Sequence, residues 1–264
     1  MITKKIGFIG CGNMGGAIFS GALESGVIGP EHIYVYDILP AVLHKINAKG
    51  VHIAANNEDL CSKSDLIILC TKPQQAEEAL ASCGSELDGK GLISITAGIT
   101  MERLSNMTQG NPRILRIMPN TPALVFEGAS AFCSETTLIE KETKVIVRLF
   151  ESIGIVEWVP EKLIDTVCGL SGGPAYTAMF IEALADGAVK NGLPRNTAYR
   201  LAAQTCMGAA KMILDTGIHP GALKDMVTSP GGTTIEGVEA LERGGLRHAL
   251  MDCINVATAK SSKL

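Results

Sequence analysis

The sequence predicts an α/β protein, with a doubly wound parallel sheet in the first part of the chain and an all-α domain in the second. Strand-like apolar runs alternate with helix-like segments through the first half, the strand runs stop near residue 160, and Ala-rich helical segments follow. Alternation of this kind is typical of parallel sheets covered on both faces, whose right-handed crossovers produce double winding. We therefore expect one domain over residues 1–160 and a second over residues 161–264.

Each predicted element has its own signal. Short apolar runs rich in β-branched residues indicate strands, and they cover residues 4–10, 32–37, 51–55, 65–73, 91–98 and 113–120. Helical spacing, often with Pro at the start and Gly at the end, indicates the intervening helices, over residues 15–26, 40–50, 57–64 and 74–87. In the second part the same signals predict helices over residues 174–192, 195–217, 233–245 and 246–264.

The composition limits the classes of partner. The chain has 264 residues, a formal net charge of −4 and a pI near 5.8, and no run of Lys or Arg, so we expect neither nucleic acid nor a membrane surface as partner. No apolar run approaches the roughly 20 residues of a membrane span, and we expect no signal peptide. None of the eight cysteines forms a C-x-x-C pair. We therefore expect free thiols in a reducing compartment, a cytoplasmic location, and neither a metal site nor disulfides.

A glycine-rich turn joins the first strand to the first helix. Gly10-Cys11-Gly12-Asn13-Met14-Gly15 matches G-x-G-x-x-G in the context that a Rossmann-type dinucleotide-binding domain requires. Gly10 permits the tight turn, Gly12 lets a pyrophosphate approach the backbone, and Gly15 lets helix and strand pack closely. The alternative is a turn without a ligand.

Other polar residues follow the strands at the edge where open α/β sheets bind ligands. Asp37 ends the second strand, where an acid accepts a hydrogen bond from the ribose 2′-hydroxyl and repels a 2′-phosphate, so the sequence leans mildly toward NADH over NADPH. His44 and Lys45 keep NADPH open. Lys72 and Pro73 are expected to border the ribose and nicotinamide, unless Lys72 is a solvated surface lysine. Asn120 either points at the nicotinamide or caps its own turn.

The chain resembles pyrroline-5-carboxylate reductases over essentially its whole length. The motifs that carry the resemblance are GFIGCGNMGGAI (7–18), TKP (71–73), MPNTP (118–122), GLSGGPAY (169–176), ADGAVKNGLPR (185–195), HPGALKDMVTSPGGTTIEG (219–237) and LERGG (241–245). The resemblance implies NADH- or NADPH-dependent reduction of the cyclic imine pyrroline-5-carboxylate to L-proline. It also implies a C-terminal dimerisation domain whose helices interleave with those of a second copy, with assembly of the dimers into a larger ring. The residues alone leave a self-contained helical bundle equally open.

The resemblance also assigns site residues. It implies cofactor contacts from Ile9, Gly10, Cys11, Gly12, Asn13, Met14, Asp37, Asn57, Cys70, Thr71, Lys72, Pro73, Thr96, Ala97 and Gly98. It implies substrate contacts from Ser229, Gly231, Gly232, Thr233 and Thr234, and a catalytic role for Thr234. The chain departs from the family in reading SGGPAY where SGSGPAY is usual, so we expect Ser171 to sit differently. Asp37 is a second departure, because members that favour NADPH often have Ser or a basic residue there.

The stretch Ser229–Gly237 suits a substrate that is both an imine and a carboxylate. Free amides at a helix start attract a carboxylate, Gly231 and Gly232 let the backbone approach, and Ser229 adds a hydroxyl. An imine basic enough to arrive protonated needs no strong general acid, so a hydroxyl from Thr234 that orients the ring nitrogen is sufficient. The alternative is an ordinary capped helix start. None of the five histidines is assigned a catalytic role.

Two other functions share parts of this sequence pattern. A β-hydroxyacid dehydrogenase has the same two-part layout but uses a lysine with an asparagine one helical turn later, whereas Lys190 and Asn191 are adjacent and cannot share a helix face. A non-catalytic dinucleotide sensor is the third possibility, and it would not need the loop from Ser229 to Thr234.

Overall fold

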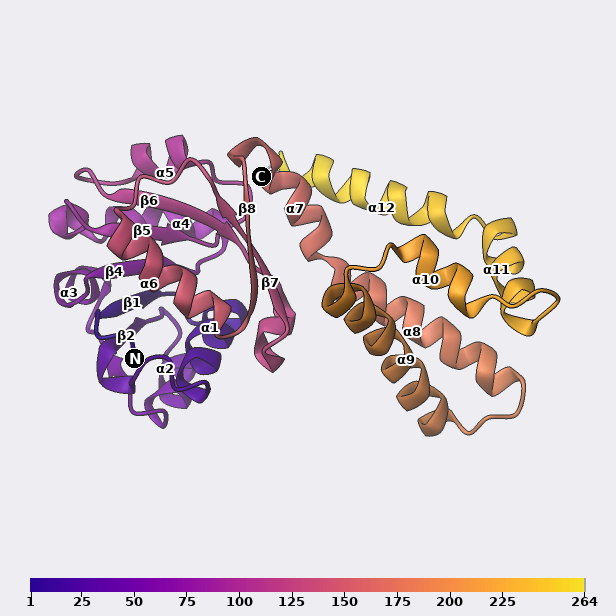
Figure 1. Ribbon diagram of the computed structural model, residues 1–264. Helices are drawn as coiled ribbons and strands as arrows, with labels where there is room; N and C mark the ends of the chain where they lie inside the picture. The colour runs from indigo at the N-terminus through magenta and orange to yellow at the C-terminus, as the bar shows by residue number, and fades with distance from the viewer. Residues whose placement is uncertain (264) are drawn as a thin grey trace. The chain divides into compact units, whose positions relative to one another are not determined.

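The computed structural model describes residues 1–263, and the chain divides into two compact units (Figure 1). The first comprises Met1–Ser171 together with the end of the chain from Val256, and the second comprises Gly172–Asn255. The division lies beyond the predicted boundary between residues 160 and 161. The reason is that helix α7 (Ile164–Ser171) packs on the sheet, where Ile164 is buried with Met118 and Ala131.

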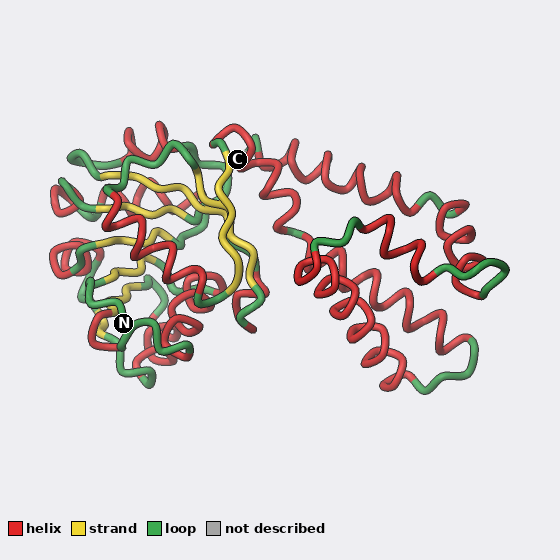
Figure 2. Tube along the Cα trace, viewed as in Figure 1, coloured by secondary structure: helices red, strands yellow, loops and turns green. Residues whose placement is uncertain are grey.

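The first unit is built on one sheet, whose strands are yellow in Figure 2. Within residues 1–263 the strand order is β3-β2-β1-β4-β5-β6-β7-β8. The strands are β1 (Ile6–Ile9), β2 (Ile33–Tyr36), β3 (His52–Ile53), β4 (Leu66–Leu69), β5 (Gly91–Ser94), β6 (Arg113–Met118), β7 (Gly128–Cys133) and β8 (Gly154–Val159). The six strands from β3 to β6 are parallel and doubly wound, as the sequence predicts. Strand β7 runs antiparallel to β6, and β8 runs parallel to β7.

Helices cover both faces of this sheet. Those of the first unit are α1 (Asn13–Glu24), α2 (Pro40–Asn47), α3 (Asn57–Lys63), α4 (Pro73–Ala81), α5 (Met101–Met107), α6 (Glu140–Glu151) and α7. One hydrophobic core packs α1, α2 and α6 against alternate strand residues such as Phe8 and Ile68. A second core packs α3, α4 and α5 against residues of opposite parity such as Ile9 and Ile67. The two cores explain why these strands read as continuous apolar runs.

Helices α5, α6 and α7 and strands β7 and β8 were not predicted from the sequence, and neither was the helix over residues 220–227 in the second unit. Strand β7 reads GASAFC, which consists mostly of small residues and lacks the β-branched run that marks a strand. Strand β8 reads GIVEWV and begins at Gly154, whose φ is +150°. A side chain at Gly154 would clash with the backbone of Gly128, so the pairing of β7 with β8 requires glycine at this position.

The second unit is helical, as predicted (Figure 2). Its helices are α8 (Gly173–Lys190), α9 (Arg195–Thr216), α10 (Pro220–Val227), α11 (Thr233–Arg243) and most of α12 (Leu246–Ser261). Gly192 and Gly217 have φ values of +97° and +68°, and they end the two long helices where the sequence analysis expected an end. Among residues 1–263, no helix combines the length and the apolar character that crossing a membrane requires.

Candidate functional site

The turn after β1 has the conformation that the glycine pattern predicts. Gly10 has a φ of +84°, and its N–H donates to the Tyr36 carbonyl oxygen at 2.9 Å. Gly12 is the N-cap of α1 and makes no side-chain capping bond. A Cβ added at Gly15 would lie 2.6 Å from the Gly10 carbonyl oxygen and 3.0 Å from the Cys70 Cβ, whereas one at Gly12 would meet no atom of residues 1–263 within 4 Å. Gly15 is therefore required for packing, and Gly12 leaves open space above the helix start.

Asp37 fixes this turn from the end of β2. Its Oδ2 accepts the Cys11 N–H at 2.7 Å, and its Oδ1 accepts the Leu39 N–H at 2.9 Å. Burial and the charge of Asp37 raise the pKa of the Cys11 thiol to about 12, so this thiol stays protonated. Asp37, which the sequence analysis assigned to a ribose, thus also accepts hydrogen bonds from two backbone amides.

A cavity of about 470 Å³ opens beside the turn, at the carboxyl ends of β1, β2 and β4. The lining residues that the sequence analysis had assigned to a cofactor are Ile9, Gly10, Gly12, Asp37, Asn57, Cys70, Thr71 and Lys72. The structure thereby brings four separate stretches of the sequence to one place. The position is the switch point of a doubly wound sheet, where ligands bind in this class of fold.

The remaining assigned residues of this unit do not line the cavity. They are Cys11, Asn13, Met14, Pro73, Thr96, Ala97 and Gly98. Thr96 is buried, and its hydroxyl donates to the Thr71 carbonyl oxygen at 3.2 Å. Gly98 has a φ of +73°, which permits the turn after β5. Asn120 accepts the Ala129 N–H at 2.8 Å through Oδ1, so it holds the turn between β6 and β7, which is the turn role that the sequence analysis left open.

Eight residues that line the cavity were not predicted from the sequence: Tyr36, Ile38, Leu39, Asn56, Gln75, Glu78, Ala79 and Ser82. Four of these lie on or just after α4 at positions i, i+3, i+4 and i+7, which form one stripe on a helix. This spacing, on the helix that follows β4, is the sequence pattern from which these four residues could have been predicted. Asn57, the first residue of α3, contacts this stripe, because the Asn57 Nδ2 donates to the Ser82 hydroxyl at 2.8 Å.

Two buried polar atoms of the lining lack a partner within residues 1–263, namely the Thr71 hydroxyl oxygen and Asn57 Oδ1. A buried hydrogen-bonding group without a partner is costly and often marks a ligand position. With the open space over Gly12 and the uncapped start of α1, these atoms fit a bound dinucleotide, whose pyrophosphate needs free amides at a helix start.

The second unit contains the loop Ser229–Thr234 between α10 and α11. Gly231 has a φ of +65°, and the Gly232 N–H donates to the Ser229 carbonyl oxygen at 3.0 Å. A Cβ at Gly232 would lie 2.3 Å from the Ser229 hydroxyl oxygen. Gly232 is the N-cap of α11 and makes no side-chain capping bond, and Thr233 and Thr234 are exposed in the first turn. The loop therefore presents uncapped amides with hydroxyl groups beside them.

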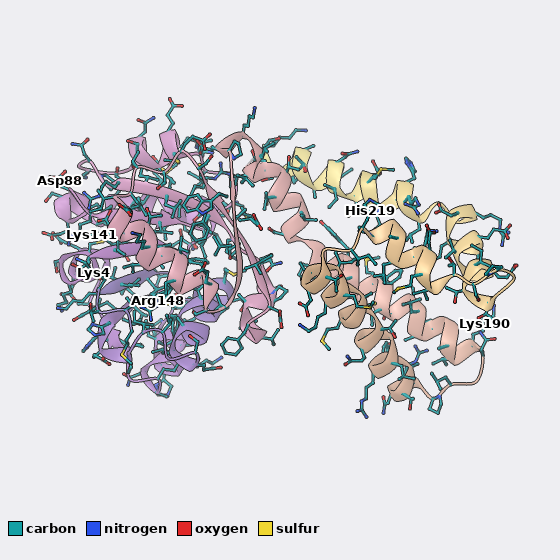
Figure 3. The ribbon with its side chains drawn as sticks, in the orientation of Figure 1. Lys4, Asp88, Lys141, Arg148, Lys190 and His219 are labelled. Carbon is teal, nitrogen blue, oxygen red and sulfur yellow. The ribbon has the colours of Figure 1, made fainter. Side chains whose placement is uncertain are left out.

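Three further residues of this unit, His219, Lys190 and Asn191, have local roles. His219, labelled in Figure 3, caps α10, where its Nδ1 accepts the Gly221 N–H at 3.1 Å. Lys190 is the last residue of α8, and Asn191 follows it as the C-cap and donates to the Gly187 carbonyl oxygen. These two residues do not form the lysine–asparagine pair of a β-hydroxyacid dehydrogenase. Ser171 ends α7, and Gly172 alone separates it from α8.

Curated relatives match the chain from end to end. A pyrroline-5-carboxylate reductase of Methanosarcina acetivorans is 42% identical over 267 residues, covering 100% of this chain and 99% of the relative. One of Escherichia coli is 44% identical over 268 residues, with the same coverage. The chain belongs to the pyrroline-5-carboxylate reductase family. A solved pyrroline carboxylate reductase of Plasmodium falciparum with NADP bound has a TM-score of 0.90 and 34% identity, and covers 100% of this chain and 98% of that one.

Family models match the two parts separately. The model for pyrroline-5-carboxylate reductase dimerisation matches residues 161–264, and the model described as NADP oxidoreductase coenzyme F420-dependent matches residues 5–98. The second match covers the glycine-rich turn, Asp37 and the cavity lining on α4. The reductase family, and not the β-hydroxyacid dehydrogenase layout or a sensor, accounts for the whole chain.

Proposed function

We propose that this chain reduces 1-pyrroline-5-carboxylate to L-proline, with NADH or NADPH as the hydride donor. The full-length similarity to pyrroline-5-carboxylate reductases of an archaeon and a bacterium carries the proposal. The dinucleotide cavity and the uncapped helix start at Gly232 support it, because the reaction needs a cofactor site and a site for a small carboxylate.

The cofactor would be held by the first unit. The amides that begin α1 would bind the pyrophosphate, Asp37 the adenosine ribose, and Thr71 and Lys72 the part of the cofactor nearest β4. When bound, the reduced nicotinamide supplies a hydride to the imine carbon. We also propose the cofactor contacts assigned to Cys11, Asn13, Met14, Pro73, Thr96, Ala97 and Gly98.

The substrate would be held by the loop from Ser229 to Thr234. Its carboxylate would accept hydrogen bonds from the first amides of α11, whose partial positive charge favours an anion. Gly231 and Gly232 keep side chains away from this position, and the exposed Ser229 hydroxyl adds a donor. A carboxylate fixed at one end leaves the ring few orientations.

Thr234 would orient the ring nitrogen. The substrate arrives as an iminium, so when the hydride bonds to the ring carbon the C=N π electrons become the nitrogen lone pair. The nitrogen then ends as a neutral amine, with no negative charge to neutralise. A neutral hydroxyl that accepts the iminium N–H is sufficient for this step, and the loop contains no histidine and no paired acid.

The test is turnover by the purified chain, followed by the fall in nicotinamide absorbance with pyrroline-5-carboxylate. We expect Thr234→Ala to lower kcat/KM by about 10²-fold, because a positioning contact made in the transition state is lost. Thr197→Ala is the matched control, since Thr197 is also an exposed threonine in the first turn of a helix of this unit. An unchanged absorbance with either cofactor would refute the function. Equal rates for the two variants would refute the role of Thr234.

We also propose that residues 161–264 form the substrate and dimerisation domain, and that two copies join through these helices and assemble further into a ring. The dimerisation model over these residues supports a dimer. So does the exposure of large apolar side chains on α8, α9 and α10, including Met179 at 70%, Leu214 at 68% and Met226 at 62%. The eight free cysteines are compatible with a cytoplasmic location, which we propose as well.

A further inference from the structure

We infer that two carboxylates, Asp37 and Glu78, make the dinucleotide cavity selective for NADH over NADPH. Both residues line the cavity, from the end of β2 and from α4. The inference rests on the proposed function only in requiring that this cavity holds the cofactor. It assigns a discriminating role to Glu78, which the sequence pattern did not single out.

Asp37 cannot move away to admit a phosphate. Its two oxygens accept the N–H groups of Cys11 and Leu39, and a rotation of the side chain would leave both amides without this acceptor. Loss of the Cys11 bond would also loosen the turn that binds the pyrophosphate. The carboxylate is therefore a fixed negative charge in the wall, and its remaining lone pairs can accept hydrogen bonds from a ribose hydroxyl.

Glu78 adds a second negative charge from another side. It is exposed, and it lies next to Ala79 and one helical turn before Ser82, both of which also line the cavity and contact Asn57. Gln75, one turn before it, is a further lining residue. Glu78 thus belongs to the part of the cavity wall that α4 forms, while Asp37, at the end of β2, accepts a hydrogen bond from the glycine-rich turn.

Among the described residues 1–263, Lys72 is the one positively charged residue of the cavity lining, and no arginine belongs to it. Lys72 is the N-cap of α4 and directly follows Thr71, and Cys70 before them packs against Gly15. It therefore adjoins the glycine-rich turn, where a pyrophosphate would neutralise it. His44 and Lys45, in the last turn of α2, do not line the cavity.

This arrangement discriminates by charge. A 2′-phosphate adds about −1.5 to −2 charge at pH 7, as a phosphate monoester does. The lining already carries two carboxylates against one ammonium, and like charges brought together in a binding site are strongly unfavourable. The 2′-hydroxyl of NADH instead donates a hydrogen bond to a carboxylate.

The test is isothermal titration of the full-length protein with NADH and with NADPH, without pyrroline-5-carboxylate. We expect NADH to bind at least about tenfold more tightly, given the cost of placing like charges together. Glu78→Gln should tighten NADPH binding about threefold or more relative to NADH binding, because it removes one of the two negative charges that a 2′-phosphate would meet. The matched control is Glu77→Gln, which removes an adjacent exposed acid that does not line the cavity.

Two further measurements separate charge from shape. The preference of wild-type protein for NADH should narrow as salt rises, because the screening length falls from about 10 Å at 0.1 M to about 3 Å at 1 M. Asp37→Asn should weaken NADH binding and tighten NADPH binding. The inference is overturned if wild-type protein binds NADPH as tightly as NADH, if Glu77→Gln and Glu78→Gln have equal effects, or if neither dinucleotide binds. NADH binding with the expected preference but no formation of proline would sustain the inference and refute the proposed function.

Discussion

Gly12 and Gly15 lie three residues apart in one turn, and the structure predicts opposite consequences for replacing each with alanine. At Gly15 a methyl group would lie 2.6 Å from the Gly10 carbonyl oxygen and 3.0 Å from the Cys70 Cβ. At Gly12 it would meet nothing within 4 Å, and the backbone there, with φ −64° and ψ −160°, is extended and open to alanine. One change should damage the fold, and the other should damage only the binding of a ligand.

The magnitude follows from two opposing contributions at Gly15. Alanine within a helix is favoured over glycine by roughly 0.5–1 kcal/mol. Overpacking against a rigid neighbour costs about 1–3 kcal/mol, and here the neighbours are backbone and Cβ atoms that cannot rotate away. Gly10 itself is held by its φ of +84° and by the bond to Tyr36. We therefore expect Gly15→Ala to lower the free energy of unfolding by about 1–2 kcal/mol, and Gly12→Ala to leave it unchanged or slightly raised.

Urea denaturation, followed by circular dichroism, measures the first effect. Isothermal titration with NADH measures the second, and Gly12→Ala should weaken binding by about tenfold or more, because the methyl group occupies the position of the pyrophosphate. The reasoning is refuted if Gly15→Ala is as stable as wild-type protein. It is also refuted if Gly12→Ala, while fully folded, binds NADH as wild-type protein does.

Two other outcomes follow from contacts away from this turn. Glu142 is buried, which raises its pKa, but hydrogen bonds from Arg113 Nε at 2.8 Å and Nη2 at 2.5 Å outweigh burial and hold the pKa below its usual value. The stability it confers is therefore present above the unfolded pKa near 4.3 and is lost as pH falls through the lower folded pKa. Glu142→Gln should lower the free energy of unfolding by about 1–3 kcal/mol at pH 7. When the pH falls below about 4, the melting temperature should fall less for the variant than for the wild-type protein. Equal falls in the two melting temperatures would contradict this. Leu214→Glu places a charge on an exposed apolar surface of α9. We therefore expect the variant to fold but to form a smaller assembly than the wild-type protein, as measured by light scattering. An unchanged mass of the assembly would exclude Leu214 from the interface between copies.

Much of the first unit could be predicted because its signals are local. Buried parallel strands read as apolar runs, and Gly10, Gly12 and Gly15 each have a conformational or packing reason that depends only on their neighbours in the turn. Strands β7 and β8 could not be predicted in this way, because the pairing of Gly128 with Gly154 is a tertiary requirement and leaves only a glycine in each sequence.

The site was predictable to a similar degree. Asp37 and Lys72 could be assigned to the cavity because Asp37 follows β2 directly and Lys72 comes three residues after the end of β4. The α4 residues Gln75, Glu78 and Ser82 could not, because their exposure to the cavity depends on how α4 lies against α3. Thr234 was assigned by resemblance alone, since an exposed threonine in a first helical turn has no distinctive pattern.

Transfer of a labelled hydride tests the central claim most directly. The purified chain would be incubated with pyrroline-5-carboxylate and NADH carrying deuterium at C4 of the nicotinamide, in separate reactions for each face of the ring, and the product analysed by mass spectrometry. We expect L-proline with one deuterium at C5 from one of the two labelled cofactors and none from the other. Unlabelled proline from both, or no proline at all, would contradict the proposed function.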